Sequence, residues 1–439
     1  MFDVSVVKYE KPMESMKKAI ELAGGIGKLS SDSKVVLKPN LVVWHEGINF
    51  PKYAVLTTSR MMEDMVVFLS DHGVKDISIV EGCVEFDKNP KHSVLAQAAK
   101  GLGYDVLTKR YGVKVVDVMK NSHTVVTIDD VELNVSTAAL EADCLINMPV
   151  LKTHSQCVTS LGIKNLKGLI NIASRKLCHN ASCETDLGYY VSKFIKMIPV
   201  GFTLIDGIYT SDRGPSYNGR ARRSDMIVAS KDMLSADLVG TRLLGFDPET
   251  VPYLSRAATD ANRPTDLSDI HIKGGIDITT ALKPHKHAFE QEESADMPDW
   301  MIRSGITGLT VPKQDTTICT YCAFFINHVF MGIAMAKNKV FDDIEILDGK
   351  IQKPTPGHKH TLLVGQCQVK LNKDNPLINH CVTIPGCPAR KKDLMKAFKA
   401  LNIESADGFE EWMEKVPEMV HMKKYEGKPE FDPSFYAIG

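Results

Sequence analysis

The stretch DCLINMPVLKTH, residues 143–154, contains the pattern on which the predicted fold depends. The apolar run at residues 142–147 has the composition of a short buried strand, and a polar segment with lysine and histidine follows it directly. Outward from this stretch, short β-rich runs alternate with helical ones; examples are strands at 34–38, 76–80 and 202–206 and helices at 59–72 and 232–244. Such alternation predicts an α/β protein with a layered, largely parallel or mixed sheet and helices packed against it.

The composition of the chain changes near residues 284–298, where His, Lys, Glu and Pro dominate and apolar residues show little periodicity. A chain of 439 residues also exceeds the usual size of one hydrophobic core. We therefore expect an α/β domain at residues 1–283 and a smaller cysteine-rich domain at 284–403. A C-terminal helix and an extended arm are expected at 404–439.

Composition excludes several function classes. The formal charge is −1, so no global field attracts nucleic acid or an anionic membrane. The first residues do not have the pattern of a signal peptide, and the apolar span 323–336 is interrupted by Asn327 and His328 and is too short to cross a bilayer. Ten cysteines without such a signal suit a reducing compartment. We expect a cytoplasmic protein from an anaerobic setting, with no nucleic-acid or membrane partner.

Four cysteines in the last third have the pattern of a metal centre. Cys319 and Cys322 form a C-x2-C pair, which places two thiolates on one tight turn. Cys367 and Cys387 each follow an apolar strand and a glycine, and Pro388 follows the last of them. Glycine lets the backbone wrap a bulky group, and a cysteine followed by proline also occurs in ferredoxin-type sequences. These four residues predict the ligand set of a [4Fe-4S] cluster.

Other interpretations of these cysteines remain open. Cys381 could replace Cys367 or Cys387, and its neighbour His380 leaves a mixed zinc site as an alternative. A redox-active dithiol at Cys319 and Cys322 is a further alternative, although the sequence shows no thioredoxin-type strand–helix frame beside the pair.

Residues 144–183 contain no aspartate or glutamate but five lysines and arginines. A solvated surface usually mixes both signs, so this window predicts a pocket for an anionic ligand such as a carboxylate or phosphate. The candidate residues are Lys152, His154, Lys164, Asn165, Lys167 and His179. The window follows the buried strand at 142–147, and open α/β sheets bind ligands at the carboxyl ends of their strands.

Other polar residues at predicted strand ends could converge on the same pocket; they are Lys38, Asn40, Glu81 and Asp206. The glycine-containing connection at 212–219 is neither a Walker loop nor a G-x-G-x-x-G fingerprint, so nucleotide binding has no support.

The sequence resembles the DUF362 proteins, a family that is uncharacterised in name. The resemblance is carried by VLKPNLV (36–42), DCLINMPVLKTH (143–154), GIKNLKGLI (162–170), DGIYTSDRGPSYNG (206–219) and ASKDMLSADLVGTRLLGFDP (229–248). It implies an α/β core and redox work, because members often carry a cluster-binding ferredoxin-like region, but it supplies no reaction. The cysteines here lack compact ferredoxin spacing. A looser likeness to nickel-pincer lactate racemases implies that His154, Lys164 and His179 face a ligand.

These observations lead to one main hypothesis, an iron–sulfur oxidoreductase or electron-transfer protein. An anionic small molecule or cofactor would bind the lysine- and histidine-rich segment, with His154 as acid or base because its unperturbed pKa is near neutral and Lys164 beside it. A redox partner protein and a second copy of the chain are further candidate partners. The alternatives are a non-catalytic protein for metal maturation or redox sensing, and a hydrolase or transferase with structural zinc.

Overall fold

The computed structural model describes residues 1–42, 44, 51–84, 93–214, 219–292, 295–411, 413 and 423–439. The chain divides into two compact units. The first comprises Met1–Cys178, Gly188–His287 and Pro417–Gly439, and the second comprises His179–Leu187 and Ala288–Val416. The helix expected around residues 410–416 includes residues 412 and 414–416, which lie outside the described residues.

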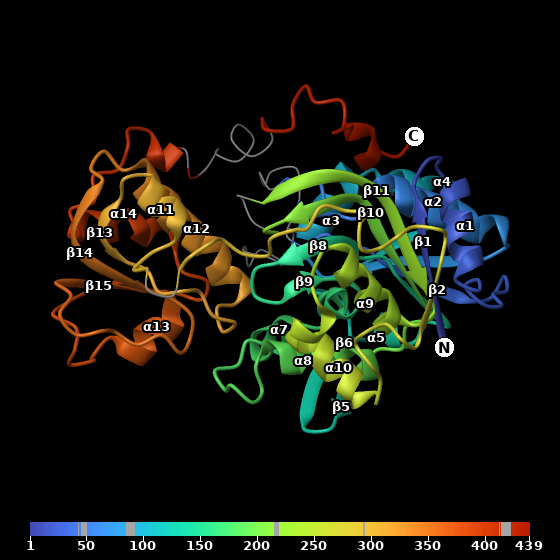
Figure 1. The fold of residues 1–439 in the computed structure, drawn as a ribbon, viewed down its shortest axis with the longest axis horizontal. Coiled ribbons are helices and arrows are strands. Elements are labelled where there is room, and N and C mark those ends of the chain that lie inside the picture. Colours follow the sequence, from blue (N-terminus) through green and yellow to red (C-terminus); the bar gives the residue numbers. More distant parts are fainter. Residues whose placement is uncertain are drawn as a thin grey trace. The chain divides into compact units, whose positions relative to one another are not determined.

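The first unit is built on a large mixed sheet with the strand order β12-β1-β11-β10-β7-β2-β3-β4, and β8 joins it beside β10 and β9 (Figure 1). The strands are β1 (Phe2–Lys8), β2 (Lys34–Lys38), β3 (Asp76–Glu81), β4 (Lys114–Asp117), β7 (Cys144–Asn147), β8 (Val150–His154), β9 (Val158–Ser160), β10 (Phe202–Asp212), β11 (Arg220–Ser230) and β12 (Ile270–Lys273). Neighbouring strands from β10 through β7, β2 and β3 to β4 are parallel, whereas β11 is antiparallel to both β10 and β1. The predicted α/β class with a parallel or mixed sheet is confirmed.

Central strands of this sheet are buried on both faces. All four residues of β7 and all eleven of β10 are buried, as expected for apolar strands that helices cover on two sides. The helices are α1 (Glu14–Leu22), α2 (Ser59–Asp71), α3 (Val94–Gly101), α4 (Tyr104–Tyr111), α5 (Thr137–Leu140), α6 (Gly162–Asn165), α7 (Ile172–Leu177), α8 (Leu187–Met197), α9 (Met233–Leu243) and α10 (Pro252–Asp260). Side chains set the starts of several helices: Thr58 accepts a hydrogen bond from the Met61 N–H at α2, and Asp232 accepts one from the Ser235 N–H at α9.

Two local expectations have different outcomes. The hairpin expected around residues 129 and 130 is present as β5 (His123–Ile128) and β6 (Val131–Ser136). The strand expected to end at Asp206 instead continues to Asp212, so Asp206 lies in the middle of β10 and is not a strand-end group. The pairing of β10 with β11 shifts register between Gly207 and Tyr209, and this irregularity lets the strand continue past the glycine.

The last residues of the chain pack against the first unit. Tyr53 is surrounded by aromatic rings from residues 423–439, including Phe431 and Tyr436, with centroid separations of 5.1 and 5.4 Å. Tyr436 is almost fully buried. The described part of the predicted C-terminal arm therefore contributes to the hydrophobic core of this unit.

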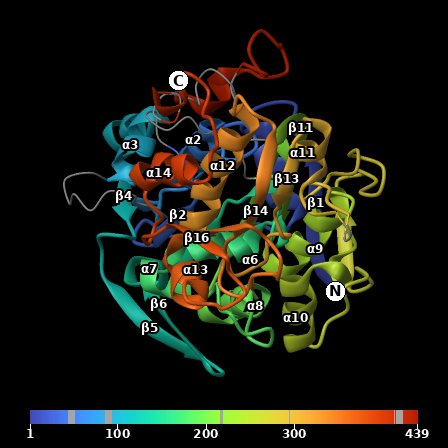
Figure 2. The same ribbon diagram turned by 90° about the vertical axis from the view of Figure 1, so that its left-hand side faces the viewer.

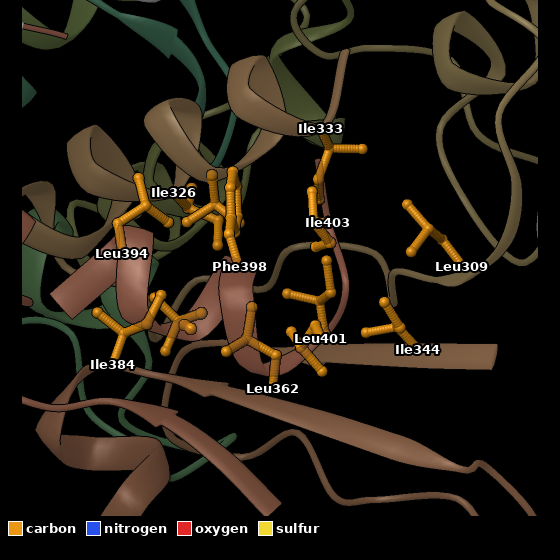
Figure 3. Close-up of a cluster of buried hydrophobic side chains, with 14 of the residues drawn as sticks. Leu309, Ile326, Ile333, Ile344, Leu362, Ile384, Leu394, Phe398, Leu401 and Ile403 are labelled. Carbon is orange, nitrogen blue, oxygen red and sulfur yellow. The ribbon is translucent and has the colours of Figure 1, made fainter. Parts of the chain in front are cut away.

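The second unit contains a four-stranded parallel sheet, β13-β14-β15-β16, formed by Thr307–Thr310, Val340–Leu347, His360–Val364 and His380–Ile384. Its helices are α11 (Asp299–Arg303), α12 (Thr320–Met335), α13 (Gly365–Asn372) and α14 (Lys391–Ala400). Figure 2 shows these elements from a second direction. Ile326 and Ile333 of α12 and Phe398 of α14 meet the sheet residues Ile344 and Leu362 in one core (Figure 3). Because every strand is parallel, their carboxyl ends lie at the same edge of this sheet.

Within the described part of the chain, no helix combines the length and the apolarity that crossing a membrane requires.

Candidate functional site

The first candidate site lies at β2, where the chain changes the side of the large sheet on which it adds strands. From β2 the chain adds β3 and then β4 on one side, whereas β7 pairs with the other side of β2. The crevice beyond the carboxyl ends of two such strands is where open α/β sheets bind ligands. Lys38 closes β2 and Asn147 closes β7, and the two residues are register partners. Lys38 was predicted here from the sequence. Asn147 was not, although a polar residue at the end of an apolar strand is a signal for it.

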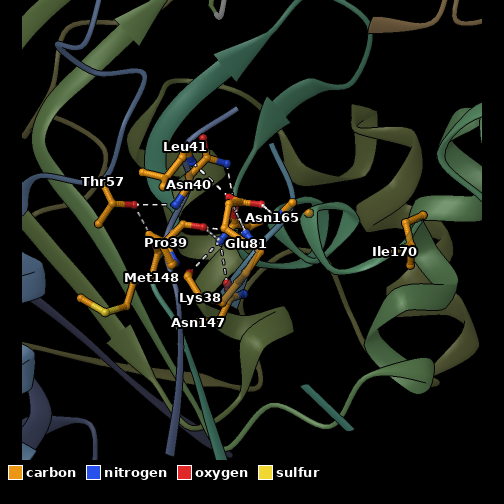
Figure 4. A network of polar contacts seen from close by, with 12 residues as sticks. Lys38, Pro39, Asn40, Leu41, Thr57, Glu81, Asn147, Met148, Asn165 and Ile170 are labelled. Carbon is orange, nitrogen blue, oxygen red and sulfur yellow. Dashed lines mark hydrogen bonds and ion pairs between the residues drawn. The ribbon is translucent and has the colours of Figure 1, made fainter. Parts of the chain in front are cut away.

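Lys38 and Glu81 form a buried ion pair at the ends of β2 and β3 (Figure 4). Lys38 Nζ lies 2.9 Å from Glu81 Oε2 and donates to the Pro39 carbonyl at 2.6 Å, and the two side chains are 0% and 3% exposed. Glu81 also accepts from the backbone N–H groups of Leu41 and Gly82. Each charge therefore has both an opposite charge and further hydrogen bonds, which a buried pair requires.

Three asparagines extend this network. The Asn165 amide oxygen accepts from Asn40 Nδ2 at 2.7 Å, and the Asn165 Nδ2 donates to Asn147 Oδ1 at 2.8 Å. Asn147 Nδ2 donates in turn to the Gly162 carbonyl at 2.8 Å. This hydrogen-bond network thus connects residues after β2, at the end of β7 and in α6, although they are far apart in sequence.

Lys152 joins the network from β8. Its Nζ donates to Asn40 Oδ1 and to the Val55 carbonyl, both at 2.6 Å, and its side chain is buried. Burial holds its pKa well below the usual range, and the nearby Lys164 lowers that pKa further. The structure therefore places Lys38, Asn40, Lys152 and Asn165 together, with their polar groups bonded to the protein. Their part in ligand binding stays a prediction.

Lys164 and Lys167 are half-buried basic residues of this region. Burial is the largest cause that lowers the pKa of Lys164, and it lowers the pKa of Lys167 to about 8. The thiols of Cys157 and Cys178 act in the opposite direction on both lysines. Among the residues that the structure describes, Lys164 has no hydrogen-bond or ion-pair partner.

Positive charge is in excess around the crevice. Lys38, Lys152, Lys164, Lys167 and Arg175 influence one another's pKa values, and Glu81 is the carboxylate that acts on Lys38 and Lys152. Arg175 is held in place because it donates to the carbonyls of Gly168 and Ile170 at 2.9 and 3.0 Å. The sequence pattern of a basic segment without acids therefore corresponds to a basic region in space.

Asp237 fixes the turn that carries Lys164. This buried residue of α9 accepts from the Gly162 N–H at 2.6 Å and from the Ile163 N–H at 2.9 Å, the first residues of α6. Burial raises its pKa to about 7, against these two hydrogen bonds. Sequence analysis missed Asp237 because the contact spans about 75 residues.

We expect Asp237→Asn to lower the free energy of unfolding by about 1–3 kcal/mol, because one amide oxygen cannot accept from two diverging N–H groups. The pH dependence of this loss of stability shows whether the Asp237 carboxyl is the group that titrates. A carboxyl whose folded pKa is raised contributes stability below its unfolded pKa, near 4, and loses it as pH rises through about 7. The deficit of the variant in urea unfolding should therefore be larger at pH 5 than at pH 8. A deficit that does not change with pH would contradict the raised pKa.

The remaining predicted residues of the basic segment lie in different places. His154 ends β8, is half-buried, and its Nδ1 accepts from the Gln156 N–H at 3.2 Å. Asp206 is buried and accepts from the N–H and hydroxyl of Thr58 at 2.7 and 2.8 Å, so it anchors the start of α2. His179 belongs to the second unit, where its Nδ1 lies 2.8 Å from the Thr316 carbonyl.

The second candidate site is at the carboxyl edge of the small sheet. Cys319 is the N-cap residue of α12, and Cys322 lies in the first turn of that helix. Cys367 lies in the first turn of α13, directly after β15, and Cys387 lies between β16 and α14. The C-x2-C pair lies at the start of α12, after the loop that follows β13. The expectation that no thioredoxin-type strand–helix frame flanks the pair stays a prediction.

Contacts between these cysteines support their convergence. Cys322 hydrogen-bonds with the Cys319 side chain, and Cys367 also raises the pKa of the Cys322 thiol. Burial is the main cause that raises the pKa of Cys367, and Cys319 and Cys387 add to it. A Cβ at Gly365, which has φ +87°, would lie 2.9 Å from Cys322 Sγ. Glycine here satisfies both the left-handed backbone and the close approach of the sulfur.

In the described residues, no group of three or more His, Cys, Asp or Glu side chains has the arrangement that holds a metal ion. Cys381 lies near the start of β16, whereas Cys387 follows its end. The pKa of Cys381 is raised by burial and is also influenced by Lys373 and Asp374, which are not part of the cysteine set. The structure thus brings Cys319, Cys322, Cys367 and Cys387 to one edge and places Cys381 elsewhere.

Comparisons with known proteins match parts of this chain. Residues 35–242 match DUF362, which is described as a domain of unknown function. The thylakoid-associated protein sll1697 of Synechocystis sp. is 24% identical over 256 residues, which cover 58% of this chain and 76% of that protein. The lactate racemase apoprotein from Thermoanaerobacterium thermosaccharolyticum matches with a TM-score of 0.33 and 13% identity, over 56% of this chain and 57% of that one. No activity follows from similarity at this level.

Proposed function

We propose that the second unit binds an iron–sulfur cluster of the [4Fe-4S] type and transfers single electrons, in concert with an anionic ligand bound by the first unit. The observation that carries the proposal is the placement of Cys319, Cys322, Cys367 and Cys387 on three connections at one sheet edge. When bound, such a cluster supplies one-electron chemistry.

Four thiolates are ligands of both a zinc ion and a cluster, and the two kinds of site differ in the spacing of their ligands. A structural zinc site needs four ligands about 2.3 Å from one point. A cubane instead bonds each cysteine to a different iron, so its ligands come from well-separated positions. Helix α12 adds an apolar shell through the buried Phe325 and Ile326, and such a shell limits access of solvent to the site.

Metal content of protein purified without oxygen tests this proposal. We expect about four irons and four sulfides per chain and a brown absorption that bleaches on reduction. Cys387→Ser should lower the iron content strongly, whereas Cys381→Ser should leave it unchanged. Gly365→Ala should also lower it, because its Cβ would meet Cys322 Sγ. Zinc alone, or equal loss in the two cysteine variants, would overturn the proposed ligand set.

A redox dithiol is the second candidate function, and a specific contact favours it. Cys319 and Cys322 hydrogen-bond with each other at the start of α12, as the two thiols of a C-x-x-C motif do. Protein without iron whose Cys319 and Cys322 interconvert reversibly between thiols and a disulfide would favour this function. In that case Cys367→Ser would leave the thiol–disulfide interconversion of Cys319 and Cys322 unchanged.

The anionic ligand is the second part of the proposal. The excess of basic groups at the end of β2 and β7 supports it, and Lys164 has no hydrogen-bond or ion-pair partner within the described part of the chain. His154 is the candidate acid or base, and Lys167 would share the charge of the ligand. Bound anion would reduce the mutual repulsion of the lysines.

We expect Lys164→Met to weaken binding of inorganic phosphate or malonate at least about tenfold, measured by calorimetry, with unchanged iron content. The variant should not be less stable. A lysine whose folded pKa is lowered destabilises the fold at pH values below that pKa, and the penalty disappears as pH rises toward 10.5. Lys100→Met on the exposed surface of α3 is the control. Equal loss of anion and iron would contradict the division of work between the units.

A further inference from the structure

A strained residue lies beside the basic network of the first unit. Ala54 has φ 58°, in the left-handed region that alanine rarely adopts, and it is fully buried. Such a backbone conformation is unfavourable and persists only where the surrounding contacts hold it. The contacts of its two neighbours, Tyr53 and Val55, therefore show what holds it.

Tyr53, on one side of Ala54, is held by residues 423–436, which we call the strap. The centroid of the Tyr53 ring lies 5.1 Å from that of Phe431 and 5.4 Å from that of Tyr436. The Tyr53 hydroxyl also donates to the Phe431 carbonyl at 3.1 Å. Release of the strap would therefore remove both ring contacts and a hydrogen bond from Tyr53.

The strap is anchored to β10 and β11 of the same unit. The Tyr209 hydroxyl donates to the Glu430 carbonyl and accepts from the Asp432 N–H, both at 3.2 Å. The Ala221 N–H donates to the Tyr425 hydroxyl at 2.9 Å. These hydrogen bonds fix the strap to the large sheet.

On the other side of Ala54, the backbone is bonded to the buried lysine of the basic network. Lys152 Nζ donates to the Val55 carbonyl and to Asn40 Oδ1, both at 2.6 Å. The hydroxyl of Thr57, two residues further on, accepts from the Asn40 N–H at 2.8 Å (Figure 4). Burial, the largest cause, holds the pKa of Lys152 well below its usual range. In its neutral form the amine has two N–H groups, and both are then bonded to the protein and withheld from a ligand.

We propose that the strap is an autoinhibitory element that withholds Lys152 from the anionic ligand of the first unit. The inference deepens the anion binding proposed above and rests on it. While the strap holds Tyr53, Ala54 stays left-handed and the Val55 carbonyl stays bonded to Lys152. When the strap releases Tyr53, the backbone at Ala54 relaxes and the carbonyl moves away. Lys152 then becomes solvated, takes a proton from solvent and binds the anion.

Phe431→Ala in the full chain tests the strap. Phosphate and malonate should bind at least about threefold more tightly than to wild type, because less of the protein is held in the closed state. Acetylation of Lys152 by succinimidyl acetate, followed by peptide mass spectrometry, should rise in the same variant. Lys38, which is buried in an ion pair away from the strap, should stay unlabelled in both proteins. Phe68→Ala on α2, where the ring lies 4.2 Å from that of His72, is the matched control and should change neither result.

Two further variants test the link between the strap and Ala54. Tyr53→Phe keeps the ring and removes only the hydroxyl that donates to the strap, so it should change affinity and labelling in the same direction but by less. Ala54→Gly in the Phe431→Ala background should return both results toward wild type, since glycine adopts a left-handed backbone without strain. Equal labelling of Lys152 in the single and the double variant would show that the strap does not act through Ala54, and would overturn the inference.

The outcomes separate the two proposals. If wild type and Phe431→Ala both fail to bind phosphate and malonate, the proposed anionic ligand is overturned and this inference with it. Anion binding that Phe431→Ala weakens or leaves unchanged, or labelling of Lys152 that does not rise, overturns the inference and leaves the proposed anion site standing.

Discussion

Lys38→Met should lower the free energy of unfolding of the first unit by about 3–5 kcal/mol. The substitution leaves Glu81, which is 3% exposed, without its cation in the interior of the sheet. Removing one member of a buried pair costs far more than the pair contributes, because the remaining charge keeps its desolvation penalty. Hydrogen exchange of peptides from β2 and β3, followed by mass spectrometry, measures the effect in this unit.

Two controls make that result specific. Lys109→Met removes an exposed partner of Asp105, 3.5 Å away within α4, and should cost less than about 0.5 kcal/mol. The double variant Lys38→Met with Glu81→Met should recover much of the loss, because replacing both members of a buried pair is often neutral. A cost for Lys38→Met that matched the surface control would show that the pair is not buried as described.

The second large effect is expected at Gly168, on the segment between α6 and α7. A Cβ at this position would lie 2.3 Å from Glu81 Oε1 and 2.7 Å from both Cε and Nζ of Lys38. We expect Gly168→Ala to cost about 3 kcal/mol or more, because either the backbone or the buried pair must move. Chemical unfolding followed by circular dichroism gives the size of the loss.

Gly240→Ala is the matched control for Gly168→Ala. Gly240 lies inside helix α9, and a Cβ there would meet only apolar side-chain atoms of Leu161, Leu151 and Ile205, at 3.0 Å or more. Its cost should stay within about 1 kcal/mol, since alanine also favours the helix. In the Lys38→Met background, Gly168→Ala should cost less than in wild type, because the two sites are in contact. If the stability losses of Gly168→Ala and Lys38→Met simply added, a steric clash between the two sites would be excluded as the cause.

Much of the fold could be predicted because it is encoded locally. The apolar runs at β2 and β7 and the polar residues that end them are visible without any knowledge of pairing. Strand length and helix periodicity depend on neighbouring residues, so the α/β class followed from the alternation alone. The positions of Cys367 and Cys387 after strands were predicted for the same reason.

The composition of the candidate sites was only partly accessible from the sequence. The acid-free segment predicted excess positive charge, but Lys38 and Lys152 proved to be buried and bonded to the protein. Asn147 and Asp237 were missed, because a single buried polar residue has no periodic signature. Asp206 was misplaced, because a glycine inside a strand has the same appearance as a strand end.

The sequence by itself determined the alternation of strands and helices, and that four cysteines and a basic segment are present. The tertiary structure alone decided which of them meet. Lys38 pairs with Glu81 across 43 residues and bonds to Asn165 across 127, and both contacts depend on β2 lying between β3 and β7. Strand order is set by how the whole sheet buries its apolar faces, which is a property of all the strands together and of no single segment.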